Sequence, residues 1–80
     1  MPYYVYVLRS LKNGRRYVGY TNNLERRISE HNCGKSKYAR LTVPFELIYF
    51  EKHESRLKAL SKERYFKSGK GRREIDLIIK

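Results

Sequence analysis

Two tyrosines and a glycine stand near the start of the chain at an interval that a plain pair of strands does not require. Tyr6 ends the run Tyr-Val-Tyr, and after ten intervening residues Tyr17 begins the run Tyr-Val-Gly, which ends at Gly19. Three further side chains that can bind anions, move protons or hold cations follow in the chain: Arg27, His31 and Glu63. Each residue type alone is weak evidence, whereas the ordered set is specific enough to be a candidate active site.

A β-hairpin is expected over residues 3–20, because two β-rich stretches flank the turn signal Asn13-Gly14. A two-residue loop at Asn13-Gly14 and a four-residue loop from Leu11 to Gly14 would both place Tyr6 and Tyr17 on the same face of the sheet, whereas a three-residue loop would separate them. With the four-residue loop, Tyr6 would lie opposite Gly19. Gly19 would then leave space beside Tyr6 where a phosphodiester could approach. The alternative is that tyrosines simply suit strands and Gly19 forms a bulge.

The remaining elements are expected in a fixed order. They are a helix capped by Asn22 or Asn23 and reaching about Asn32 before Gly34, a basic connector over residues 35–40, a buried strand over 45–51, a helix over 55–67, a break at Gly69 and Gly71, and a last helix over 72–80. The order β-β-α-β-α-α predicts an α+β fold, in which helices cover a three-stranded antiparallel sheet.

The two long helices each carry a polar candidate near an apolar stripe. On the first, Arg27 and His31 lie one turn apart at the edge of a stripe set by Leu24 and Ile28, while Arg26 and Glu30 are expected to point away. On the second, Glu63 falls on the arc of the apolar positions Leu57, Ala59, Leu60 and Phe66. A carboxylate that faces the core needs a partner or a function. The alternative for Glu63 is a simple ion pair with Lys67, and for Arg27 it is a side chain that covers the sheet edge.

Length and charge bound the function. The chain has 80 residues, enough for one small domain over residues 1–80, and a formal net charge of +11. This charge, together with 8 Tyr, favours nucleic acid as the partner, with a merely solvated basic surface as the alternative. The expected phosphate contacts are Lys35, Lys37, Arg40, Lys67, Lys70, Arg72 and Arg73.

Other locations and site types are not expected. No segment combines a basic face with a broad apolar one, so we do not expect binding to a membrane. The sequence shows no signal peptide, and we expect a cytoplasmic protein. Cys33 is the single cysteine, at a helix end, so neither a disulfide framework nor a thiolate metal site is predicted. The acidic residues do not form the carboxylate cluster that a two-metal nuclease uses, so a two-metal site is not expected.

The ordered set of Tyr6, Tyr17, Gly19, Arg27, His31 and Glu63 resembles the active-site signature of the GIY-YIG endonuclease domain, with a match from about Tyr3 to Arg73. The resemblance implies the same fold, an Arg27 that binds the scissile phosphate, and a Glu63 that holds one divalent cation, Mg²⁺ or Mn²⁺. Tyr6 would take the proton from the attacking water, with Arg27 and the cation favouring its phenolate, and Tyr17 would position the phosphate or the water. His31 matches a histidine found in part of the family, and a hydrogen-bonding role is the alternative.

The match departs from the family pattern in three respects. Tyr4 replaces the first glycine of the family name, valines replace both isoleucines, and no asparagine follows Asn32.

Our leading hypothesis is a metal-dependent endonuclease acting on DNA, favoured over RNA, with branched, nicked or single-stranded forms as candidate substrates. The alternatives are a nucleic-acid-binding module that retains the fold without catalysis, and a basic accessory protein of a larger nucleoprotein assembly.

Overall fold

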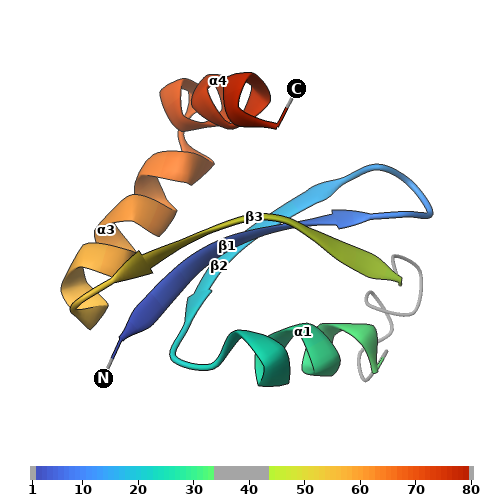
Figure 1. Cartoon of the computed structure of the whole chain (residues 1–80). Helices are drawn as coiled ribbons and strands as arrows, with labels where there is room; N and C mark the ends of the chain where they lie inside the picture. Colours follow the sequence, from blue (N-terminus) through green and yellow to red (C-terminus); the bar gives the residue numbers. More distant parts are fainter. Residues whose placement is uncertain (1, 34–43, 80) are drawn as a thin grey trace.

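A computed structural model of the chain describes residues 2–33 and 44–79. Within these two ranges, three strands and three helices follow one another in the order β1 (Tyr3–Ser10), β2 (Arg16–Thr21), α1 (Leu24–Asn32), β3 (Phe45–His53), α3 (Arg56–Lys67) and α4 (Gly69–Ile78) (Figure 1). This is the predicted order, and the predicted α+β architecture is confirmed. The basic connector and the helix stop at Gly34 lie outside the described residues. None of the helices in the described ranges is both long and apolar enough to cross a membrane.

The hairpin between β1 and β2 has the longer of the two loops considered from the sequence, with the register that this loop predicts. Ser10 N donates to Arg15 O at 2.9 Å, which closes a four-residue loop, and Gly14 adopts a φ of +74° that favours glycine. The strands pair antiparallel with Tyr6 opposite Gly19 and Leu8 opposite Tyr17. Tyr6, Gly19 and Tyr17 therefore share one face of the sheet.

The sheet order is β2-β1-β3, so β2 is an edge strand. The antiparallel pairing of β1 with β3 shifts between Val7, which faces Tyr49, and Leu8, which faces Leu47. One extra residue, Ile48, is thereby accommodated on β3 as a bulge. Because the bulge changes the alternation of side chains, Phe45 comes to lie on the Tyr6 face together with Phe50. The apolar run predicts a buried strand, but β3 is an edge strand and its side chains are half-buried or exposed.

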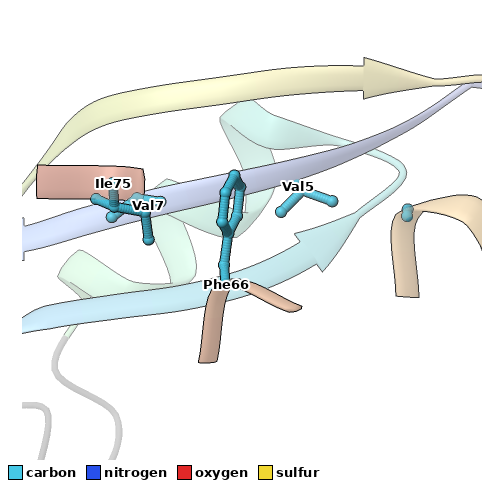
Figure 2. Close-up of a cluster of buried hydrophobic side chains, with 5 residues drawn as sticks. Val5, Val7, Phe66 and Ile75 are labelled. Carbon is cyan, nitrogen blue, oxygen red and sulfur yellow. The ribbon is translucent and has the colours of Figure 1, made fainter. Parts of the chain in front are cut away.

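The hydrophobic core lies on the sheet face opposite Tyr6. Val5 and Val7 of β1 pack there against Ala59 and Phe66 of α3 and Ile75 of α4, and all five are at most 1% exposed. Figure 2 shows the Phe66 ring pointing toward the strand that carries Val5 and Val7. Helix α1 lies on the other side of the sheet from α3 and α4 (Figure 1). Leu57, predicted as part of the apolar arc, is instead 78% exposed in the first turn of α3.

The junction of α3 and α4 differs from the prediction. The sequence suggests that Gly69 and Gly71 break the chain between two helices, but both lie in the first turn of α4. Ser68 alone separates the helices, and its hydroxyl accepts from Gly71 N at 3.2 Å as the N-cap of α4. A Cβ at position 71 would collide with the carbonyl oxygen of Tyr65, so this glycine permits the close approach of the two helices.

Candidate active site

The Tyr6 hydroxyl lies at the centre of a hydrogen-bonded group. Arg27 Nε donates to it at 3.2 Å, and His31 Nε2 stands 3.3 Å from it. Because Arg27 supplies its own proton to the phenol oxygen, the Tyr6 proton can be donated to His31 when the imidazole carries its hydrogen on Nδ1. Helix α1 holds both partners, since Asn23 caps it by accepting from Arg26 N at 3.1 Å and so fixes its start beneath the sheet.

Gly19 makes room for Tyr6 itself. A Cβ at position 19 would lie 2.5 Å from the Tyr6 hydroxyl oxygen, so the phenol ring extends across the backbone of β2. The expectation that a phosphodiester occupies the space over Gly19 is therefore wrong, because the Tyr6 ring fills that space. Tyr6 is 1% exposed as a result.

Tyr17 is the accessible tyrosine of the pair. It is 38% exposed, its ring centroid lies 6.4 Å from that of Tyr6 in a stacked arrangement, and 4.6 Å from that of His31. Phe45, brought to this face by the bulge in β3, packs edge-on against His31 at 5.7 Å. The contact between Phe45 and His31 could not be predicted from the sequence. In a strand without a bulge, side chains alternate strictly, and Phe45 would lie on the face opposite Phe50.

Arg27 is half-exposed and turned toward the two tyrosines. Its hydrogen bond with Tyr6 is the main cause that raises the pKa of Arg27 above its ordinary value, and Tyr17 and Glu30 add to the rise. Glu30 is expected from the sequence to point away, but its carboxylate lies 3.4 Å from Arg27 Nη1. A permanently charged guanidinium is thus held beside Tyr6 and Tyr17 with part of its surface open to solvent.

Burial sets the protonation of Tyr6 and His31. It raises the pKa of Tyr6 above its ordinary value of 10.0, and the opposing effect of Arg27 does not cancel this rise. Arg27 alone lowers the pKa of Tyr6, as expected from the sequence, but burial outweighs this effect and the pKa is raised. Burial, assisted by the charge of Arg27, lowers the pKa of His31 below 6.5. At neutral pH both side chains are therefore uncharged, as a hydrogen bond from a phenol to an imidazole requires.

Glu63 lies on α3, the helix that packs against the sheet face opposite Tyr6. Its side chain is 14% exposed, and Lys67 Nζ lies 3.6 Å from its carboxylate, so the ion pair considered as the alternative is present. Its charge contributes to raising the pKa of Tyr6, which places it within electrostatic range of that hydroxyl. The described residues contain no group of three or more His, Cys, Asp or Glu side chains arranged to hold a metal ion. A lone carboxylate nevertheless fits Mg²⁺, which commonly takes one or two protein carboxylates plus water and substrate phosphates.

The predicted phosphate contacts fall into two sets. Lys67, Lys70, Arg72 and Arg73 are exposed at the end of α3 and the start of α4. Lys35, Lys37 and Arg40 lie outside the described residues.

Comparison with known proteins decides the family. A profile described as the GIY-YIG catalytic domain matches residues 2–76. The chain belongs to the GIY-YIG family. Members are usually nucleases, typically bind nucleic acids and generally use a divalent metal.

Among GIY-YIG relatives, the chain is similar to small stand-alone proteins of the UPF0213 group. It is 44% identical over 77 residues to one from Clostridium perfringens, covering 94% of this chain and 81% of the relative. An archaeal one from Natronomonas pharaonis is 43% identical over 67 residues, covering 82% and 78%. The solution structure of a UPF0213 protein from Bacillus halodurans matches with a TM-score of 0.60 and 35% identity, over 98% of this chain and 83% of that one.

Proposed function

We propose that this chain is a divalent-metal-dependent endonuclease that hydrolyses DNA phosphodiester bonds. The observation that carries the proposal is the Tyr6 hydroxyl, which is hydrogen-bonded to Arg27 and His31 on a face that also presents the accessible Tyr17. Membership of a family of nucleases and the net charge of +11 support it.

Arg27 and Tyr17 are suited to binding the scissile phosphate. The guanidinium presents a planar set of donors to the non-bridging oxygens, and its fixed charge offsets the negative charge that develops there in the transition state. Its bond to Tyr6 and its ion pair with Glu30 orient it before substrate arrives. The hydroxyl of Tyr17 can donate to a phosphate oxygen from the exposed side of the sheet.

Tyr6 and His31 can move the proton of the attacking water. As the water oxygen attacks phosphorus, its proton passes to the Tyr6 oxygen while the Tyr6 proton passes to His31 Nε2. Such a transfer avoids a free phenolate, which burial of Tyr6 disfavours. A bound phosphate would add negative charge near His31 and so favour the imidazolium that forms. Glu63 would hold the divalent cation. When bound, this cation would stabilise the negative charge that develops on the leaving oxygen.

Lys67, Lys70, Arg72 and Arg73 are proposed to contact backbone phosphates away from the scissile bond. Such contacts would make binding strongly dependent on salt and almost independent of sequence. Each mutation that removes one of these basic side chains should reduce the salt slope for duplex DNA by about one unit.

The test is a cleavage assay with Mg²⁺ or Mn²⁺, and with EDTA, on linear, nicked, branched and single-stranded DNA and on RNA. We expect cleavage of at least one DNA form that EDTA abolishes. Arg27→Ala should lower the rate by about 100-fold or more, as removal of a transition-state donor usually does. Arg26→Ala is the matched control, because Arg26 is its exposed neighbour on α1 and bonds Asn22 Oδ1 at 3.2 Å. Cleavage by Arg27→Ala at the wild-type rate would refute the proposed role.

A second candidate is a nucleic-acid-binding module without turnover. Two observations favour it: Tyr6 is almost completely buried, and the Glu63 carboxylate already has Lys67 as a partner. This candidate predicts DNA binding with no metal-stimulated cleavage of any form in the same assay.

A further inference from the structure

A cleft of about 680 Å³ lies between the first half of β2 and the junction of α3 with α4. Its lining residues are Arg15, Arg16, Tyr17, Val18, Phe66, Lys67, Arg72 and Ile75. Tyr17 lines this cleft and also packs against Tyr6 and His31, so the cleft and the candidate active site meet at the edge strand β2. Its volume falls within the roughly 300–1,000 Å³ of pockets that hold small organic groups.

The charges along the cleft are cationic. Two of its four basic residues are already paired: Arg16 with Asp76 at 2.6 Å, and Lys67 with Glu63 at 3.6 Å. Arg15 and Arg72 are exposed, and within the described ranges neither forms an ion pair with an acid. These two guanidiniums, one from the hairpin and one from α4, are the groups available to an incoming phosphate.

The inner part of the cleft is apolar. Val18 on β2 is half-buried and leaves carbon surface open to the cleft, whereas Phe66 and Ile75 are at most 1% exposed and form its closed floor as part of the hydrophobic core. A cationic rim over an apolar interior suits a nucleotide whose phosphate meets the arginines while its base or sugar covers carbon surface. A duplex presents phosphates but keeps its bases stacked inside, so it would use the rim alone.

We propose that this cleft binds an unpaired nucleotide of the DNA strand that continues from the scissile phosphate, with Arg15 and Arg72 on its backbone. The inference rests on the proposed function, because Tyr17 joins the cleft to the site of cleavage. It assigns Arg15 a role in substrate binding and makes single-stranded DNA, or a duplex with a single-stranded branch, the preferred substrate.

The test is fluorescence anisotropy in EDTA with a labelled single strand of about 12 nucleotides, within the usual site size of such grooves, and with the matching duplex. The double variant Arg15→Gln/Arg72→Gln should bind the single strand about tenfold or more weakly, with a salt slope reduced by about 0.7 for each arginine replaced. Its affinity for the duplex should fall by a clearly smaller factor, since a duplex leaves the apolar interior unused and keeps its contacts with Lys67, Lys70 and Arg73.

Lys58→Gln is the control, because Lys58 is an exposed basic residue on α3 that lines a different pocket, together with His53 and Glu74. Its binding of both DNA forms should match the wild type, and unchanged melting temperatures would show that the variants are folded. A double variant that binds the single strand like the wild type would overturn the proposal. So would equal weakening for single strand and duplex, which would indicate a general effect of charge.

The outcomes for the cleft and for the proposed function can be told apart. If the wild type cleaves no DNA but the double variant selectively loses single-strand binding, the endonuclease proposal fails and the cleft stands. If the wild type cleaves DNA and the double variant both binds and cleaves single-stranded substrates normally, the cleft is refuted and the endonuclease stands.

Discussion

The phenol ring of Tyr6 crosses the edge strand at Gly19, and no larger residue at position 19 could leave the Tyr6 hydroxyl where it is. A Cβ there would lie 2.5 Å from that oxygen and 2.7 Å from the adjoining ring carbon. The same oxygen meets Arg27 Nε at 3.2 Å and His31 Nε2 at 3.3 Å. A glycine on β2 therefore determines the position of a hydroxyl from β1 and of two side chains from α1.

Gly19→Ala should impair activity more than stability. The added methyl group meets the far end of a side chain, which can rotate aside at modest cost, but the hydroxyl then leaves Arg27 and His31. We expect cleavage to fall by about tenfold or more, because small displacements of catalytic groups are costly. The measurement is the cleavage rate together with a thermal melt.

Gly69→Ala is the matched control for this glycine substitution. Nothing lies within 4 Å of a Cβ at position 69, in the first turn of α4. Alanine there should leave cleavage unchanged and stabilise the fold by about 0.4–1 kcal/mol, since it restricts the unfolded chain. Equal activity of the two variants would show that Gly19 does not position Tyr6.

The fold was predictable because its signals are local. Asn13-Gly14 marks the turn, and either even-length loop considered from the sequence places Tyr6 and Tyr17 on the same face. The four-residue loop of the structure then puts Tyr6 opposite Gly19. The course of Tyr6 over Gly19 was not predictable in the same way. Because glycine has no side chain, Gly19 suggests open space in the sequence, and only the packed structure shows that the Tyr6 ring fills this space.

The differences from the predicted fold have longer-range causes. The bulge at Ile48 carries no glycine or proline, so nothing in the sequence marks the change of alternation that brings Phe45 to His31. Gly69 and Gly71 suggest a break because glycine disfavours helix interiors. Position 71 requires glycine for the contact of α4 with the Tyr65 carbonyl, a tertiary constraint that outweighs propensity.

Glu63→Gln should separate metal binding from ion pairing. The amide keeps the size of the side chain but is a poor ligand for Mg²⁺, so metal-stimulated cleavage should fall by orders of magnitude while DNA affinity stays within a few-fold. Loss of the pair with Lys67 should cost at most about 0.5 kcal/mol of unfolding free energy, because Lys67 is largely exposed.

Lys67→Gln completes the comparison, since it breaks the same ion pair and leaves the carboxylate in place. It should retain most of the metal-stimulated rate. Full activity in Glu63→Gln, or an equal loss in both variants, would contradict the assignment of Glu63 as the metal ligand. Chemical denaturation of the two variants checks that the folded fraction is the same.

Stability should depend on the protonation of His31 in mildly acidic solution. Burial and Arg27 lower the pKa of His31 in the folded protein below 6.5, while Glu30 opposes them. The unfolded chain therefore binds the proton more readily, and stability falls as pH drops below the unfolded pKa toward the folded one. Melting temperatures of the wild type and His31→Gln between about pH 7 and pH 5 should converge as the pH falls. Parallel curves would argue against a buried, neutral His31.

Removing each tyrosine hydroxyl in turn should distinguish the buried partner from the exposed one. Tyr6→Phe deprives Arg27 Nε and His31 of a shared partner, so it should lower both the cleavage rate and the unfolding free energy, the latter by about 0.5–1.5 kcal/mol. Tyr17 is 38% exposed, so Tyr17→Phe should change stability by no more than about 0.5 kcal/mol.

The kinetic readout of the two variants separates their roles. Tyr17→Phe removes a donor to the phosphate, so its loss of kcat/KM should be similar at all pH values where the fold is intact. Tyr6→Phe breaks the route from water to His31, so its kcat should fall and lose the acidic limb that His31 imposes on the wild type. Rates measured from about pH 5 to pH 9 on the preferred DNA form provide the test. A Tyr6→Phe enzyme that kept the wild-type pH profile would show that the proton leaves the attacking water by another path.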